Sequence, residues 1–351
     1  MSTPAPSRRE FLERLTLGST ALAGMGLAGC AGQPAGEAVT GSGGGQKPLR
    51  ACFSNAGLQS TWCTQGKRTA ELWGKLLNVE IEWVDGEFDP ERQRNKIDLI
   101  AGQNFDFCCF QAVQIDSLVE PVKQLKERGI PVISMDTLVV EMSKMRDVGV
   151  WCEVMPDHVK MAEMSAGYML QKIGGKGKVI HIGGLSAHSG AKDRDQGFRN
   201  VVAKYPEVEV VGGGVRWCDW KKEKARETFE ALLQQETTPI AGAFFHSDDM
   251  ALGCIPSLKN SIHKDMVVAA VDGQKEGLDA IKSGDLASTA VNPVCLIHQM
   301  ALIVGQFIVR NKEAIETVPE VIITPGPLVT RDDQQTLDAM YYLSADAHCL
   351  V

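Results

Sequence analysis

The chain has 351 residues, of which 44% are hydrophobic, and its formal net charge at pH 7 is −8. This hydrophobic content is typical of globular proteins and excludes a mainly disordered chain. The acidic balance argues against nucleic-acid binding, which needs a basic surface, and it gives no reason to expect adhesion to anionic lipid. A chain of this length favours two domains over one compact core.

The N-terminal stretch MSTPAPSRREFLERLTLGSTALAGMGLAGC combines a charged region, an apolar region and a small-residue exit. Its uncharged run, residues 15–29, is too short for a membrane-spanning helix, which needs about 20 residues, and it has the order of a secretory signal. The pair Arg8-Arg9 followed by Phe-Leu resembles a twin-arginine export signal, and the ending Leu-Ala-Gly-Cys resembles a bacterial lipobox. We therefore expect residues 1–29 to be a lipoprotein signal and Cys30 to carry the lipid. The alternative is that Cys30 is only a small residue near an ordinary cleavage site.

Residues 30–48 are rich in Gly, Ala and Ser and lack apolar periodicity, which predicts a flexible linker. From residue 49 onward, short apolar stretches alternate with stretches of helical spacing. The first unit has expected strands at 49–54, 79–84, 105–110 and 130–136, with helices at 64–77, 90–102 and 116–129. The second unit has expected strands at 148–154, 177–184, 208–217, 240–247, 266–273 and 287–292, with helices at 156–175, 189–206, 220–235, 248–261 and 275–284, and a last helix at 294–313. This alternation predicts an α/β fold of two doubly wound, Rossmann-like units, each with a parallel sheet covered by helices on both faces.

The chain has ten cysteines, and nine remain if Cys30 is lipidated. No two have the Cys-x-x-Cys spacing of a zinc knuckle or a thioredoxin-type site. Cys108 and Cys109 are adjacent in an expected strand, so their side chains should point to opposite faces and not bond each other. We expect most of the thiols to be small apolar core residues. A twin-arginine route is consistent with this because it exports proteins that are already folded.

Ligands of doubly wound sheets bind beyond the carboxyl ends of the strands. The residues that follow the expected strands here are polar and aromatic and contain no metal-ligand cluster. The sequence also lacks His-Glu-x-x-His, Gly-x-Ser-x-Gly and Gly-x-Gly-x-x-Gly. We therefore expect a binding protein and not an enzyme, with no cofactor and no metal.

Two polar stretches have a structural as well as a functional interpretation. Ser247 and Asp248 open an expected helix, where such residues act as caps, but they also follow a strand. Arg194 lies in the first turns of a helix, where a positive charge is unfavourable. It is either a surface charge or a forked donor that points across a cleft to ligand oxygens, and we favour the ligand role.

Several stretches occur together in a fixed order: PVISMDT, GKVIHIGG, AKDRDQGF, DDMALG, VAAVDG, LASTAVNP and IITPGPLVT. This ordered set resembles the periplasmic sugar-binding proteins of the ribose-binding type, which are substrate receptors of bacterial ABC importers. The resemblance covers residues 49–331. It implies two domains, residues 49–152 plus 293–326 and residues 153–292 plus 327–351, which are joined by a three-stranded hinge and close on one ligand.

The resemblance also implies roles for particular residues. Asp136, Arg194, Asp272 and Asn292 would bind sugar hydroxyls or ring oxygens, while Trp220 would be an aromatic contact and Trp62 the candidate for stacking on the ligand. The full set of predicted ligand-binding residues is Ser54, Ser60, Trp62, Asp136, Thr137, Arg194, Trp220, Ser247, Asp248, Asp272 and Asn292. Two positions depart from the ribose type, which has an arginine where this chain has Thr137 and an asparagine where it has Ser247. Both departures shorten the contact, which argues against ribose itself and favours a larger or differently substituted sugar, a polyol such as an inositol, or another small polar molecule.

The resulting hypothesis is a monomeric, exported receptor that is anchored by lipid at the periplasmic side of a membrane or at the cell surface. It would bind a small sugar or polyol and deliver it to an ABC permease. The alternative is a sensory module that presents its closed form to a chemoreceptor or a sensor kinase. Both use the same closed state, so the sequence leaves this choice open.

Overall fold

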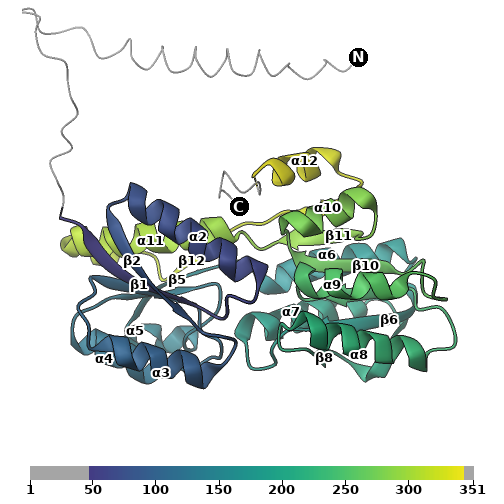
Figure 1. Ribbon diagram of the computed structural model, residues 1–351, viewed down its shortest axis with the longest axis horizontal. Helices are drawn as coiled ribbons and strands as arrows, with labels where there is room; N and C mark the ends of the chain where they lie inside the picture. The colour runs from purple at the N-terminus through teal and green to yellow at the C-terminus, as the bar shows by residue number, and fades with distance from the viewer. Residues whose placement is uncertain (1–46, 344–351) are drawn as a thin grey trace, which may run out of the picture. The chain divides into compact units, whose positions relative to one another are not determined.

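The computed structural model describes residues 47–343, except the side chains of residues 313–315. The predicted signal, the lipidation site at Cys30 and most of the predicted linker lie outside these residues. Two mainly parallel sheets organise the described chain (Figure 1). We call the sheet that begins at β1 and its helices the N-lobe, and the sheet that begins at β6 and its helices the C-lobe.

The N-lobe sheet has the strand order β12-β5-β4-β3-β1-β2, and all its pairs are parallel. Its strands are β1 (Leu49–Asn55), β2 (Val79–Asp85), β3 (Phe107–Phe110), β4 (Val132–Met135), β5 (Val150–Met155) and β12 (Val321–Ile323). Its helices are α2 (Thr61–Leu76), α3 (Pro90–Ala101), α4 (Val119–Glu127), α5 (Met145–Val148) and α11 (Val294–Arg310). In Figure 1, α2 and α11 lie on one side of this sheet, and α3 and α4 lie on the other.

The C-lobe sheet has the order β13-β11-β10-β9-β6-β7, with β8 also paired to β6. Only β13 runs antiparallel to its neighbour among the described pairs. The strands are β6 (Lys176–Gly183), β7 (Glu207–Val210), β8 (Arg216–Trp217), β9 (Gly242–Phe245), β10 (Val267–Asp272), β11 (Ser288–Val291) and β13 (Leu328–Thr330). The helices are α6 (His158–Lys172), α7 (Ser189–Val202), α8 (Lys222–Gln235), α9 (Asp248–Cys254), α10 (Lys275–Ser283) and α12 (Gln334–Leu343). Short 3-10 turns occupy Met142–Lys144, Val211–Gly213, Ile255–Leu258 and Lys312–Thr317.

The two sheets, each flanked by helices, confirm the predicted fold of two doubly wound units. The chain passes between the lobes three times: from β5 to α6, from β11 to α11, and from β12 to β13. Strand β5 continues to Met155 in the N-lobe sheet, beyond the domain boundary predicted at residue 152. The strand predicted at 208–217 is interrupted between β7 and β8, because Gly212 and Gly213 take φ values of 75° and 77°, which extended strands do not allow.

Each sheet packs a separate apolar cluster on each of its faces, as period-two alternation requires. In the N-lobe, Phe53 and Cys109 pack toward α2 and α11, while their neighbours Cys52 and Cys108 belong to the cluster that contains residues of α3, α4 and α5. Cys108 and Cys109 therefore do point to opposite faces. All eight cysteines that the structure describes are buried, in agreement with the prediction that most of the thiols are core residues.

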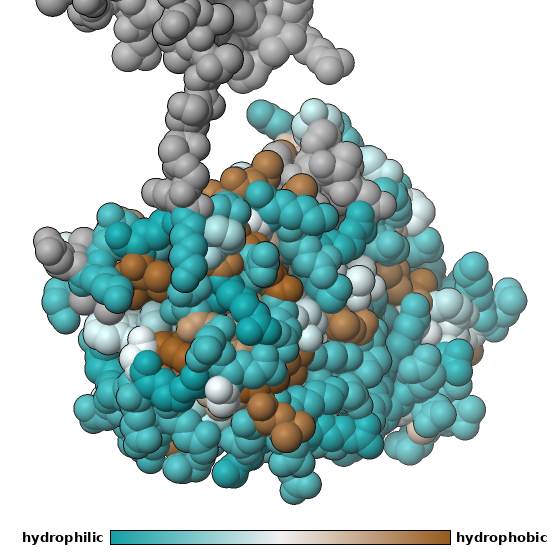
Figure 2. All heavy atoms as spheres, turned by 60° about the vertical axis from the view of Figure 1, so that its left-hand side comes forward, coloured by the Kyte–Doolittle hydropathy of each residue, from teal (hydrophilic) through white to brown (hydrophobic). Residues whose placement is uncertain are grey.

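The outer surface shown in Figure 2 is mainly hydrophilic, with separate hydrophobic groups instead of one continuous band. Among residues 47–343, no helix combines the length and the apolar character that a membrane crossing requires. In doubly wound folds, ligands bind at the carboxyl ends of the parallel strands.

Candidate functional site

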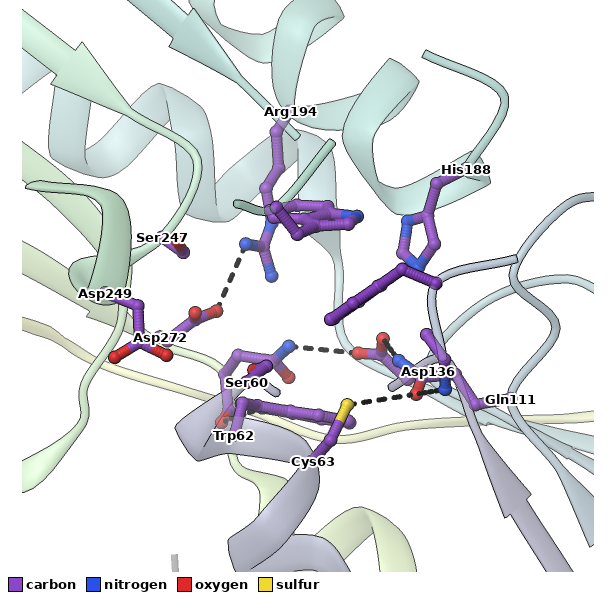
Figure 3. A pocket seen from close by; sticks show the side chains of 14 residues that line it. Ser60, Trp62, Cys63, Gln111, Asp136, His188, Arg194, Ser247, Asp249 and Asp272 are labelled. Atoms are coloured by element: carbon purple, nitrogen blue, oxygen red, sulfur yellow. Dashed lines mark hydrogen bonds and ion pairs between the residues drawn. The ribbon is translucent and has the colours of Figure 1, made fainter. Parts of the chain in front are cut away.

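A cavity lies at the carboxyl ends of the strands, and both lobes contribute side chains to it (Figure 3). It encloses about 430 Å³ of space between atoms, part of which is open to solvent. Its lining consists of Ala56, Ser60, Trp62, Cys63, Phe88, Gln111 and Asp136 from the N-lobe, His188, Arg194, Trp220, Ser247, Asp249 and Asp272 from the C-lobe, and Asn292 from the segment between β11 and α11. Eight of these residues are in the set that the sequence predicts: Ser60, Trp62, Asp136, Arg194, Trp220, Ser247, Asp272 and Asn292.

Asp136 follows β4 and is held by donors from three directions. Gln111 Nε2 donates to Oδ2 at 2.6 Å, and Asn292 Nδ2 donates to Oδ1 at 3.0 Å. The ring of His158 lies at 2.8 Å from the Asp136 carbonyl oxygen and at 3.5 Å from Oδ1. Burial raises the pKa of this carboxyl, but the interactions with His158 and Arg194 outweigh it and leave the pKa below its ordinary value. The carboxylate is therefore ionised and keeps lone pairs for a ligand hydroxyl.

Arg194 extends from the first turns of α7 into the cavity and is only 3% exposed. Its Nη1 donates to Asp272 Oδ1 at 3.1 Å and also to the carbonyl oxygen of His246. The guanidinium carbon lies 5.5 Å from the centre of the Trp220 ring. The structure thus excludes the surface-charge interpretation of Arg194. A buried arginine that is paired with a carboxylate is well placed to orient ligand oxygens.

Two tryptophans line the cavity, one from each lobe. Trp62, in the first turn of α2, is buried and donates through Nε1 to the Asn292 carbonyl at 3.2 Å. Trp220 sits in a left-handed turn with φ 59°, which directs its indole over Gly184. A side chain at position 184 would collide with this ring, since a Cβ there would lie 2.2 Å from Trp220 Cε2. The glycine that follows β6 is therefore required for the aromatic wall.

The lobes touch each other around the cavity. Asp249, in the first turn of α9, accepts hydrogen bonds from the N–H and the hydroxyl of Thr61 at 2.9 and 3.0 Å. The N–H of Leu138 donates to the hydroxyl of Ser189 at 3.0 Å. Together with the bond between Asn292 and Asp136, these contacts hold the cavity in a closed arrangement.

Three predicted ligand-binding residues, Ser54, Thr137 and Asp248, are not among those that line the cavity, and their side chains make contacts within the protein. The Ser54 hydroxyl accepts from Gln93 Nε2 at 3.0 Å, and Thr137 donates to the Ala112 carbonyl at 3.0 Å. Asp248 accepts from the Gln274 N–H at 2.8 Å and from the Thr289 hydroxyl at 2.7 Å. All three side chains therefore connect neighbouring segments of their own lobe. Ser247 lines the cavity, as a ligand-binding role would require, and it also caps α9 by accepting from the Met250 N–H at 3.3 Å.

Six lining residues were absent from the predicted set: Ala56, Cys63, Phe88, Gln111, His188 and Asp249. Gln111 directly follows β3, so its position at a strand end was a signal for it. Asp249 was not in the predicted set because the stretch that contains it also has the composition of a helix cap. Phe88 and His188 lie in loops, and no spacing in the sequence directs them to the cavity. Within residues 47–343, no three His, Cys, Asp or Glu side chains are grouped so that they could hold a metal ion.

The family described as "Periplasmic binding protein domain" matches residues 51–307 of this chain. The chain is 27% identical over 274 residues to the xylitol-binding protein of Mycolicibacterium smegmatis, an alignment that spans 78% of this chain and 75% of that protein. It is 26% identical over 292 residues to the ribose import binding protein of Bacillus subtilis, with 83% and 92% of the two chains covered.

Its fold is similar to that of a solved ABC transporter solute-binding protein from Mycobacterium smegmatis with bound glycerol, with a TM-score of 0.75. That superposition covers 87% of this chain and 99% of the other, at 24% sequence identity. The family match spans most of the described residues, including nearly all of both sheets. The chain therefore belongs to the periplasmic binding protein family, which confirms the prediction of a solute-binding protein and not an enzyme.

Proposed function

We propose that the protein binds one small sugar or sugar-like polyol in the cavity between its lobes and delivers it to an ABC importer. The observation that carries this proposal is the lining itself. Carboxylate, amide and guanidinium groups from both lobes converge there beside two indoles. Hydroxyls both donate and accept hydrogen bonds, so they match such groups, and the C–H faces of sugars and polyols pack against aromatic rings.

The size and charge of the cavity narrow the ligand class. The space between the lining atoms is about 430 Å³ even with its solvent-open part included, which favours a ligand no larger than a monosaccharide over an oligosaccharide. Asp136, Asp249 and Asp272 face one buried arginine, so the cavity disfavours sugar acids and sugar phosphates. The names of the relatives, xylitol-binding and ribose import binding proteins, support the same class.

Ligand capture is proposed to occur by closure of the lobes around the three segments that pass between them. The segments lie between Met155 and His158, between Val291 and Val294, and between Ile323 and Leu328. Because ligand contacts come from both lobes, the ligand stabilises the closed form, and this form is what an importer can recognise.

We also propose an export route and a lipid anchor for this protein. Residues 1–29 act as a twin-arginine export signal, Cys30 carries the lipid, and the following linker leads to the folded body. The body would then remain near a permease in the same membrane. The order of charged, apolar and small residues in the N-terminal stretch supports this proposal.

The central experiment is a thermal-shift screen of the purified protein against xylitol, ribose, glycerol, myo-inositol and matched sugar acids. A ligand that binds only the folded state raises the melting temperature by mass action. We expect at least one neutral polyol or sugar to raise it and the sugar acids to leave it unchanged. Stabilisation by the acids alone would contradict the proposed ligand class.

A further inference from the structure

His188 lines the cavity, and its buried Nδ1 has no hydrogen-bond partner among the described residues. It precedes α7 and has the extended backbone of a helix N-cap, with φ −82° and ψ 128°, but its side chain makes no capping hydrogen bond. The side chain is only 4% exposed and lines the cavity. Figure 3 shows the imidazole on the same side of the cavity as Asp136, across from Asp249 and Asp272.

The hydrogen-bonding state of His188 distinguishes it from the other histidines that the structure describes. At least one ring nitrogen is hydrogen-bonded in each of the others: His158, His181, His246, His263 and His298. Nδ1 of His188 is buried and has no partner among residues 47–343. Leaving such an atom unpaired costs roughly 1–3 kcal/mol, so its burial is best explained by a partner that arrives with the ligand.

Further unpaired atoms line the same cavity. Asn292 directs Nδ2 to Asp136, which leaves its buried Oδ1 without a described partner. Trp220 Nε1 is likewise buried and unpaired among the described residues, and its ring packs against His188 edge to face, with 5.3 Å between centres. The edge-to-face contact fixes the orientation of the imidazole. The cavity lining thus contains an unpaired donor at Trp220 Nε1 and an unpaired acceptor at Asn292 Oδ1 in addition to His188.

The protonation state of His188 suits a hydroxyl ligand. Burial lowers the pKa of His188 to about 3, so the ring is neutral at physiological pH. A neutral imidazole presents one N–H donor and one acceptor nitrogen. A hydroxyl can satisfy either of them, whereas a purely apolar ligand group can satisfy neither.

We propose that His188 is a specificity-determining residue that hydrogen-bonds one ligand hydroxyl from the C-lobe, beside the hydroxyl that Asp136 binds from the N-lobe. This inference rests on the proposed function, because it assumes a hydroxyl-rich ligand. It implies that the protein discriminates against analogues that lack this particular hydroxyl, since the imidazole would then stay buried and unpaired.

The test uses isothermal titration calorimetry with the tightest binder among xylitol, ribose, glycerol and myo-inositol. The reference ligand is compared with its available monodeoxy derivatives, on the wild type and on His188→Ala and His188→Asn. We expect His188→Ala to weaken the reference ligand about tenfold or more, as loss of one hydrogen bond to a buried group implies. One monodeoxy derivative should bind the wild type and His188→Ala equally well. His188→Asn, which keeps a donor and an acceptor, should recover part of the affinity.

His263 offers a matched control, because it is also a buried histidine of the C-lobe. Its Nδ1 accepts from the Ile240 N–H at 3.1 Å, and its Nε2 donates to the Leu233 carbonyl at 3.1 Å, so its role is structural. His263→Ala should lower the melting temperature of the ligand-free protein and leave the affinity unchanged. His188→Ala should lower the affinity without lowering the melting temperature of the ligand-free protein. Unchanged affinity in His188→Ala, or an equal loss for every derivative, would overturn the inference and leave the proposed function standing. Failure of all four ligands to bind the wild type would overturn both.

Discussion

The carboxylate of Asp249 in the C-lobe caps the start of α2 in the N-lobe. Its two oxygens accept from the N–H of Thr61 at 2.9 Å and from the Thr61 hydroxyl at 3.0 Å. Within α2 itself, Ser60 makes no side-chain capping hydrogen bond, and the first turn has no acidic residue. A helix N-terminus favours a negative charge because its first N–H groups are unpaired and its dipole is positive there. The lobes make this interaction only when they are together.

Asp249→Ala should therefore weaken ligand binding by destabilising the closed form. Helix caps contribute about 0.5–2 kcal/mol, which corresponds to roughly a 2- to 30-fold loss of affinity. Calorimetry measures the affinity, and small-angle scattering should show a more open protein at a subsaturating ligand concentration. Asp279→Ala is the control, because this exposed carboxylate lies on the surface of α10 and pairs with Lys275 at 3.1 Å.

A second variant separates the cap from a direct ligand contact. Thr61 does not line the cavity, so Thr61→Val removes one of the two hydrogen bonds without changing the lining. It should reproduce part of the loss, and the effect of Asp249→Ala should be smaller in the Thr61→Val background. Fully additive effects of the two substitutions would show that Asp249 acts on the ligand and not through α2.

Asp136→Ala should abolish ligand binding while the protein still unfolds cooperatively. The substitution removes an acceptor that Gln111 and Asn292 orient, and it leaves their donors unpaired in a buried site. We expect a loss of affinity of at least about 100-fold, together with a loss of about 1–3 kcal/mol in unfolding free energy. Calorimetry and denaturant unfolding check the two parts. Asp98→Ala, at a partly exposed site on α3, should change neither, and normal binding by Asp136→Ala would mean that the ligand lies elsewhere.

Glu153→Gln should change how stability depends on pH. Glu153 lies in β5, is fully buried, and has no hydrogen-bond partner for either carboxyl oxygen among the described residues. Burial raises the pKa of Glu153 well above its ordinary value. The folded state therefore holds a proton that the unfolded state releases above about pH 4.3, so this group loses stabilising effect as the pH rises toward the folded pKa.

Below about pH 4, the difference in unfolding free energy between wild type and Glu153→Gln should thus stay constant. At each higher pH, the variant should become more stable relative to the wild type. The gain should approach about 1.4 kcal/mol per pH unit until the folded pKa is reached. Chemical denaturation at a series of pH values between 4 and 8 measures it. Glu80→Gln, at an exposed site in β2, should track the wild type, and a constant difference across pH would contradict the assignment for Glu153.

Cys30→Ser should release the protein from the membrane fraction. Thioether attachment of lipid needs the thiol, and a serine at this position cannot be lipidated in the same way. Fractionation of cells that express wild type and variant measures the distribution. Cys349→Ser is the control, since Cys349 is another cysteine outside the described residues. If the variant stays with the membrane, the lipidation proposal is wrong.

The alternation of apolar and amphipathic stretches was sufficient to predict the two parallel sheets. It also placed Asp136, Asp272 and Asn292 just after strands, at the carboxyl ends where ligands of doubly wound sheets bind, whereas Arg194 was singled out by its charge in the first turns of a helix. The resemblance added the pairing of the lobes and the candidates Trp62 and Trp220. These parts of the site lie at strand ends and in the first turns of helices, and hydrophobic periodicity in the sequence predicts where strands end and helices begin.

Hydrophobic periodicity does not predict the direction in which an individual side chain points at a strand end. Ser54, Thr137 and Asp248 stand at strand ends or helix starts, as many of the cavity residues do, but their hydroxyls and carboxylate bind neighbouring segments of the same lobe. A single residue step at a strand end moves a side chain from the cavity to the packed side, and local backbone angles decide which occurs. These angles depend on contacts with other segments.

The sequence by itself thus determined the elements, their order and the chemical character of the site, since these depend on periodicity and on residue type. Only the tertiary structure decided that Asp249 caps the helix of the opposite lobe and that His188 Nδ1 is buried without a hydrogen-bond partner among residues 47–343. Both facts arise from segments that are far apart in the chain and meet only when the lobes come together.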